Sequence, residues 1–195
     1  MWQGQIQIRS ERRSSRFQPR EFEVNNQPTH ALVAYLASQQ GGKGTLGKKA
    51  VQKYIHILSS LSGLDVGYEF SFYTYGPFSR DLASDLDILD GAKAINVRYN
   101  SADNAYSITA TPMTHAIAQT LSPALIAEAD RVWGLFSGRT AKELELISTA
   151  LFVSDEEGLP MASSDMTSRI QALKPKYSVS EVMAAQAELA SIIGS

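Results

Sequence analysis

The chain of 195 residues contains no cysteine. This absence excludes a disulfide framework, a zinc–thiolate site, an iron–sulfur cluster and a cysteine nucleophile. A chain of this length buries roughly two thirds of the surface that its unfolded state exposes, so it needs neither a disulfide nor a metal ion to fold. We therefore expect an ordinary globular domain with its own hydrophobic core.

Long apolar segments are also missing. No run approaches about 18 consecutive apolar residues, which excludes a transmembrane helix. Residues 1–8 lack the apolar stretch of a secretory signal. We therefore expect a cytoplasmic protein that does not bind a membrane.

The formal net charge of −2 hides an uneven distribution. Residues 1–53 hold nine of the 18 lysines and arginines but three of the 20 acidic residues, so residues 54–195 are strongly acidic. Polar and charged residues without periodicity fill residues 9–27. We expect residues 1–27 to form a flexible basic arm, which is either a solvated tail or a contact for nucleic acid or a partner.

Helical periodicity begins at Thr29, a predicted N-cap, and returns in residues 46–61. In the second of these helices, Lys48, Lys49 and Lys53 share one arc of the surface. Apolar residues at helical spacing form its buried stripe: Val51, Tyr54, Ile55, Leu58 and Leu61. The pattern predicts an amphipathic helix with one basic face.

Aromatic residues alternate with polar ones over residues 68–75 and predict a strand, followed by a turn at residues 76–78. A helix is expected from its N-cap Ser79 to Asp90. Residues 94–100 and 105–109 then predict a β-hairpin. Further helices are expected to begin after four capping residues: Thr111, Ser122, Thr140 and Ser178. A shorter helix is expected from Ser163 to Leu173.

A β-hairpin directly after a pair of helices is typical of a winged helix. We therefore predict an α+β fold that is mostly helical, with a winged-helix-like core, a small antiparallel sheet and additional C-terminal helices. Residues 28–195 are expected to form a single domain. The helix after Thr140 is apolar on nearly all sides and is predicted to be central to the core.

Four segments in chain order carry recognisable motifs: residues 49–55 (KAVQKYI), 73–79 (YTYGPFS), 143–149 (ELELIST) and 174–178 (KPKYS). Together they resemble the YwgA-like bacterial proteins, which are related to the SocA-like antitoxin domain, also called Panacea. The resemblance spans about residues 28–193. Val51, where the family pattern prefers leucine, and His56, where it is usually apolar, depart from it.

The resemblance implies a helical domain that neutralises a toxin or links a partner to a protease, and it supplies no catalytic residue. We therefore expect a non-enzymatic protein-interaction module of antitoxin or adaptor type. No cofactor and no metal are expected. A homodimer stays open as a further alternative.

Two sets of side chains are candidates for partner contact. Tyr73, Tyr75, Phe78 and Arg80 are neighbours in sequence, and tyrosine and arginine dominate protein interfaces energetically. The alternative is a DNA-binding transcriptional regulator, which would use the basic residues Arg12, Arg13, Arg16, Lys48, Lys49 and Lys53. The helix over residues 79–90 would be a poor recognition helix, because its four aspartates repel phosphate.

Enzymatic chemistry, such as that of a hydrolase or nuclease, has less support in the sequence. Three histidines, His30, His56 and His115, show neither metal-ligand spacing nor an acidic partner. Carboxylates can bind magnesium or transfer protons, and four of them crowd one predicted helix: Asp81, Asp85, Asp87 and Asp90. We interpret Asp81 as favouring the helix N-terminus and the other three as facing solvent, and we assign no catalytic residue.

Overall fold

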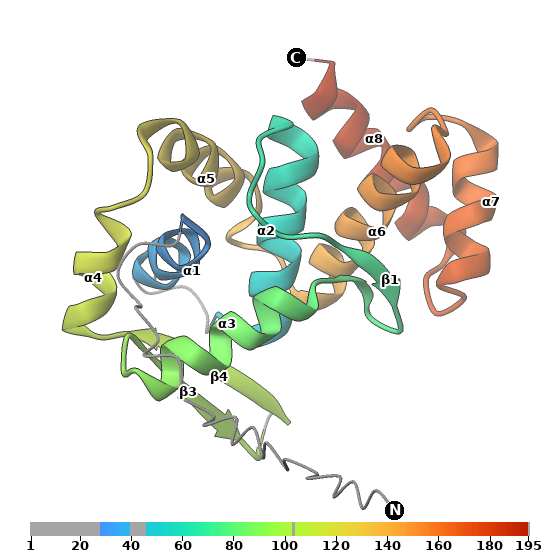
Figure 1. The fold of residues 1–195 in the computed structure, drawn as a ribbon. Helices are drawn as coiled ribbons and strands as arrows, with labels where there is room; N and C mark the ends of the chain where they lie inside the picture. The colour runs from blue at the N-terminus through green and yellow to red at the C-terminus, as the bar shows by residue number, and fades with distance from the viewer. Residues whose placement is uncertain (1–27, 40–45, 103, 195) are drawn as a thin grey trace, which may run out of the picture.

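The computed structural model describes residues 28–39, 46–102 and 104–194. Within these ranges the chain is mostly helical, as predicted, and it contains two small antiparallel sheets where one was predicted (Figure 1). The helices are α1 (Pro28–Ser38), α2 (Lys48–Ser62), α3 (Arg80–Gly91), α4 (Pro112–Ala118), α5 (Pro123–Phe136), α6 (Ala141–Glu157), α7 (Ser164–Leu173) and α8 (Val179–Ile193). The strands are β1 (Ser71–Tyr73), β2 (Gly76–Phe78), β3 (Ile95–Asn100) and β4 (Ala105–Ala110), paired as β1–β2 and β3–β4.

The predicted basic arm, with Arg12, Arg13 and Arg16, lies outside the described residues. In the ranges that the structure describes, no helix combines the length and the apolar character that crossing a bilayer requires.

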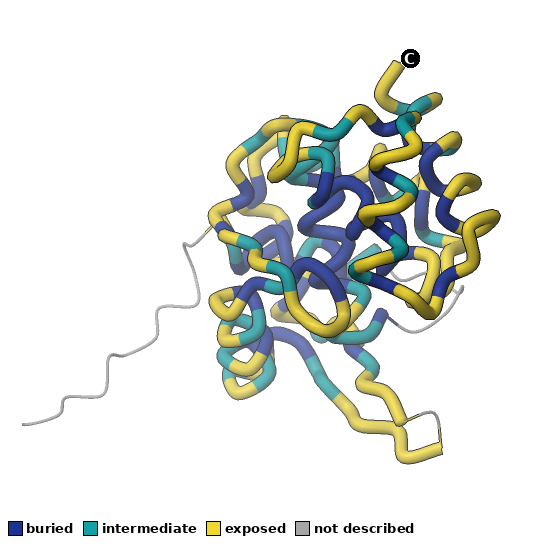
Figure 2. The backbone as a smooth tube through the Cα atoms, turned by 90° about the vertical axis from the view of Figure 1, so that its right-hand side faces the viewer, coloured by how far each residue is buried: buried dark blue, intermediate teal, exposed yellow. Residues whose placement is uncertain are grey.

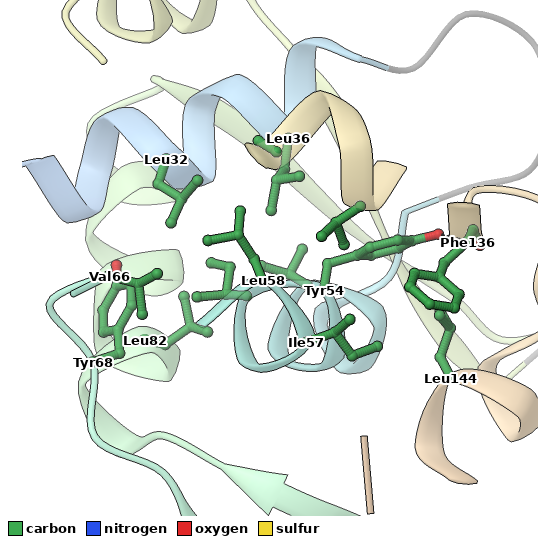
Figure 3. Close-up of a cluster of buried hydrophobic side chains, with 14 of the residues drawn as sticks. Leu32, Leu36, Tyr54, Ile57, Leu58, Val66, Tyr68, Leu82, Phe136 and Leu144 are labelled. Atoms are coloured by element: carbon green, nitrogen blue, oxygen red, sulfur yellow. Dashed lines mark hydrogen bonds between the residues drawn. The ribbon is translucent and has the colours of Figure 1, made fainter. Parts of the chain in front are cut away.

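Helix α2 is the centre of the fold. Figure 1 shows α1, α4 and α5 on one side of it and α6, α7 and α8 on the other. Its Tyr54 and Leu58 lie among apolar side chains of α1 and α5, and Ile57 extends the cluster towards Leu144 of α6 (Figure 3). The backbone around this cluster is buried, whereas exposed residues line the outer helices (Figure 2). The predicted central position of α6 is confirmed, because every residue from Leu144 to Leu151 is buried.

The single apolar stripe predicted for α2 is incomplete. All eight residues from Val51 to Leu58 are buried, including the polar Gln52, Lys53 and His56. The helical spacing of the apolar residues correctly predicts one buried face of α2. The opposite face is covered by β2 and α6, which are distant in sequence and leave no periodic signal in α2 itself.

The first part of the chain contains α1, the bridging residue Leu46, α2, hairpin β1–β2, α3 and hairpin β3–β4 in this order. Apart from the inserted hairpin β1–β2, this is the order of elements in a winged helix. Leu46, before α2, forms a β-bridge with Ile108 of β4 and so adds a third short pairing to the hairpin. The predicted hairpin is confirmed, with Val97 opposite Ile108 in antiparallel register.

The prediction for residues 68–78 is partly wrong. The strand is limited to β1, and residues 76–78, predicted as a turn, form β2. The turn is instead Thr74 and Tyr75, with Tyr73 opposite Gly76. Gly76 has φ +80°, a backbone conformation that glycine adopts without strain. Pro77 is tolerated because both strands of a two-stranded sheet are edges.

Helix termini follow the local signals. All four predicted N-caps after α3 accept a hydrogen bond from the backbone of the following turn, as does Ser79 before α3. Ser163, predicted as the first residue of its helix, is the N-cap of α7. Thr29 is an exception, because α1 already includes Pro28 and Thr29 is its second residue.

Candidate partner-binding site

A cavity of about 390 Å³ lies beside hairpin β1–β2, between the N-terminal half of α2 and the first turns of α3. Side chains from both sets of candidate residues line it, those predicted to contact a protein and those predicted to contact DNA. Its lining is Lys48, Lys49, Gln52, Lys53, Tyr73, Thr74, Tyr75, Gly76, Phe78, Ala83, Leu86 and Asp87. The aromatic residues predicted for a protein partner and the lysines predicted for DNA therefore line the same cavity, whereas Arg80 is outside the lining and bonds to Tyr73.

The predicted aromatic residues lie at the rim of this cavity. Tyr73 is 46% exposed and Tyr75 is 53% exposed. The Tyr73 and Phe78 ring centroids are 5.5 Å apart, and the Arg80 Nη2 donates a hydrogen bond of 2.8 Å to the Tyr73 hydroxyl. The Lys49 Nζ lies 3.8 Å from the centroid of the Tyr75 ring. The structure thus brings all four predicted residues to one surface.

Buried side chains hold hairpin β1–β2 from beneath. Gln52 accepts a hydrogen bond from the backbone N–H of Ser79 and donates one to its carbonyl, at 2.8 and 2.9 Å. The Lys53 Nζ donates to the carbonyl of Pro77, and the Lys174 Nζ donates to the carbonyl of Thr74, at 2.5 and 2.6 Å. Two lysines from distant segments therefore fix the backbone that carries the exposed tyrosines, and Gln52 fixes the residue that follows it.

The buried lysines are balanced by Glu145 of α6. Its two carboxylate oxygens lie 2.8 Å from the Nζ atoms of Lys174 and Lys176. Burial raises the pKa of Glu145, but hydrogen bonds from the two lysines more than offset this and hold the pKa below its usual value. Burial lowers the pKa of Lys53 to about 8, although the negative charge of Glu145 opposes the shift.

The roles of Glu145 and Lys174 were not predicted from the sequence. The sequence contains a signal for the burial of Glu145. Glu145 is a charged residue inside a helix that is otherwise apolar on nearly all sides, which predicts a buried and paired carboxylate. Lys174 belongs to the KPKYS motif, but its partner is 29 residues away in the chain, and no local pattern indicates the pairing.

The predicted basic face of α2 is wrong in part. Lys53 is only 4% exposed, because β2 and α6 cover that arc of the helix. Lys48 forms an ion pair of 2.5 Å with Asp87 of α3. Of the three lysines, Lys49 is the one that is exposed, so the face does not present three cations to solvent.

The aspartates of α3 also differ from the prediction that three of them face solvent. Asp85 accepts a hydrogen bond of 2.7 Å from the Tyr68 hydroxyl and lies 3.2 Å from the His30 Nε2, so His30 does have an acidic partner. Burial would raise the pKa of Asp85, but these two partners hold it below its usual value. Asp90 accepts from the backbone N–H of Val97. Asp81 and Asp87 are exposed, and Asp87 pairs with Lys48.

The remaining two histidines, His56 and His115, differ in their exposure. The His56 Nδ1 lies 3.1 Å from the Ser148 hydroxyl, and Ser148 is fully buried. Burial lowers the pKa of His56 to about 3, so this ring is neutral. His115 is exposed on α4. Among the described residues, no group of three or more His, Cys, Asp or Glu side chains is arranged to hold a metal ion.

These structural roles follow from contacts within this chain. No protein-family model and no curated protein matches this chain.

Proposed function

We propose that this chain is a cytoplasmic, non-enzymatic protein-interaction module of antitoxin or adaptor type, which binds its partner through hairpin β1–β2. The observation that carries the proposal is the pair of half-exposed tyrosines on a backbone that buried side chains hold in place. An aromatic side chain on a fixed backbone contributes a large contact area and loses little conformational entropy on binding.

The surroundings of the tyrosines favour a protein partner. Arg80 and Tyr73 are hydrogen-bonded to each other, and arginine and tyrosine are the residue types that contribute most to interface affinity. The adjoining cavity gives a partner side chain a place to insert. The resemblance to the YwgA-like and SocA-like proteins supports a toxin or a component of a protease system as that partner.

The experiment is affinity capture from the native host with purified, tagged chain. Tyr75→Ala and Arg80→Ala are expected to reduce recovery of the specific partner at least tenfold, a loss typical of central interface residues. The matched control is Tyr99→Ala, which removes an equally exposed tyrosine from hairpin β3–β4. If Tyr75→Ala and Arg80→Ala leave both the captured partner and the state of dimerisation unchanged, the β1–β2 surface is structural and the proposal is wrong.

The DNA-binding alternative stays a prediction that depends on Arg12, Arg13 and Arg16, outside the described residues. It requires a steep salt-dependent shift of duplex DNA. Absence of binding at about 50 mM salt would remove it.

A further inference from the structure

We propose that the cavity beside β1–β2 binds a large apolar side chain of the partner protein together with an acidic side chain next to it in the partner sequence. This inference rests on the proposed function and deepens it, because it names the chemistry that the site recognises.

The walls of the cavity select the apolar group. Phe78, Ala83 and Leu86 contribute hydrocarbon surface, and Leu86 is almost completely buried at the base. A volume of about 390 Å³ is at the lower end of the range for ligand sites, which suits one large side chain rather than an extended ligand. A leucine, phenylalanine or tryptophan of the partner fits this description.

The charges around the cavity select the acidic group. Three lysines line it, and Asp87 is the one acidic residue among the described lining residues. Asp87 already pairs with Lys48. The lining therefore has a surplus of positive charge, and an anionic partner group restores the balance.

Lys49 is the side chain placed to meet a partner carboxylate. It is exposed, and it forms no ion pair with any residue in the described ranges; its Nζ lies over the Tyr75 ring, 3.8 Å from the centroid. A carboxylate beside the inserted apolar group would receive a charge-assisted hydrogen bond from this ammonium. Lys53, whose Nζ donates to the Pro77 carbonyl at the base, adds positive potential from below.

The same charge argument disfavours the basic segment of this chain as the occupant. Residues 1–27 contain five arginines and three glutamates, so they bring further positive charge to a positive site. We therefore assign the cavity to a second protein.

The test is an unbiased selection of random dodecapeptides displayed on phage against the full chain. Enriched peptides are expected to carry Asp or Glu within two positions of Phe, Trp or Leu. Synthetic, C-terminally amidated versions should bind about tenfold more weakly to Lys49→Gln, in line with the loss of one charge-assisted hydrogen bond. Ala83→Met, which fills the cavity, should weaken binding at least as much. Lys142→Gln, an exposed lysine outside the lining, should leave affinity unchanged.

Several results would overturn the inference. These are enrichment of neutral or basic peptides, no enrichment above the library, or equal affinity for Lys49→Gln. Equal binding by a peptide whose only carboxylate is its free C-terminus would assign the cavity to a chain end instead. Competition by a synthetic peptide of residues 1–27 would assign it to this chain.

The partner-capture experiment separates this inference from the proposed function. If Tyr75→Ala loses the partner and Lys49→Gln retains it, the proposed function stands and the acidic contact is wrong. If both variants retain the partner, both proposals are wrong.

Discussion

The described residues form two antiparallel hairpins, β1–β2 and β3–β4, which are supported in different ways. Each exposes two tyrosines to a similar degree: Tyr73 and Tyr75 on β1–β2, and Tyr99 and Tyr106, 55% and 48% exposed, on β3–β4. Hairpin β3–β4 has six paired positions in its ladder, whereas β1–β2 has three. The far end of β3–β4 projects from the body with exposed residues, as Figures 1 and 2 show.

Different contacts hold the two hairpins rigid. A short isolated hairpin is marginally stable in water, so three residue pairs do not hold β1–β2 by themselves. Two of its backbone carbonyls are instead bound by Lys53 and Lys174, and Gln52 binds the backbone of Ser79, directly after β2. Hairpin β3–β4 is anchored at its base, where Ile95 and Ile108 are buried, and beyond that by its own ladder. The tyrosines of β1–β2 are therefore fixed by the core, which suits them for partner recognition.

The largest expected effect comes from removing the charge that balances the lysines under β1–β2. Glu145→Gln leaves Lys174 buried without its counter-ion, and we expect the free energy of unfolding to fall by about 3 kcal/mol. Glu157→Gln, at the other end of α6, removes an exposed ion pair with Arg169 and should cost less than about 1 kcal/mol. Urea denaturation of both variants makes the measurement. Equal losses would contradict the buried anchoring of β1–β2.

A smaller effect is expected from crowding the β1–β2 turn. A Cβ at residue 76 would lie 3.0 Å from the Thr149 Oγ1 and would need the φ of +80°. We expect Gly76→Ala to reduce stability by about 2 kcal/mol. Gly63→Ala is the matched control, because Gly63 has φ +65° with open space around its Cβ position, and it should cost about 1 kcal/mol. A Gly76→Ala variant no less stable than Gly63→Ala would show that the turn is loosely packed.

Alkaline pH offers a milder way to probe the same anchor. Burial lowers the pKa of Lys53 to about 8, from an ordinary value of 10.5 in the unfolded chain. Between these values the unfolded chain retains a proton that the folded chain has released, so raising the pH favours the folded state. Relative to Lys53→Met, the wild type should gain about 1 kcal/mol between pH 8 and pH 9. If the difference in the free energy of unfolding between wild type and Lys53→Met stays constant from pH 7 to pH 10, folding does not lower the pKa of Lys53.

The smallest effect on stability should come from the exposed tyrosines themselves. Tyr75→Ala removes a cation–π contact with Lys49, and Tyr99→Ala removes a ring contact with Tyr106 at 5.2 Å. Both changes should cost less than about 1 kcal/mol, measured by thermal denaturation. If the two variants are equally stable but only Tyr75→Ala loses the partner, the loss is due to binding and not to unfolding. A large loss for Tyr75→Ala would instead give this residue a structural role.

Signals that are local in sequence predicted the fold well. Ser79, Thr111 and Thr140 are predicted as N-caps by their own side chains and the next three residues, and the structure confirms them. The hairpin β3–β4 is likewise read from alternation over adjacent segments.

Signals that depend on distant segments could not be read in this way. Lys53 lies on the arc of α2 that helical geometry predicts, yet that arc is covered by β2 and α6. Gly76 and Pro77 have turn chemistry, but they form a strand because Phe72 pairs with Pro77 and buried lysines bind the backbone. The candidate site was found through its exposed aromatic residues, whereas its buried support required the structure.

Photo-crosslinking in living cells shows directly which of the two hairpins contacts a partner protein. The chain carries benzoylphenylalanine in place of Tyr75 or, as the matched variant, in place of Tyr99. We predict a discrete covalent adduct with one partner protein from position 75 and at least several-fold less from position 99. Equal adducts from the two positions, or an adduct from position 99 alone, would contradict the assignment of partner binding to β1–β2.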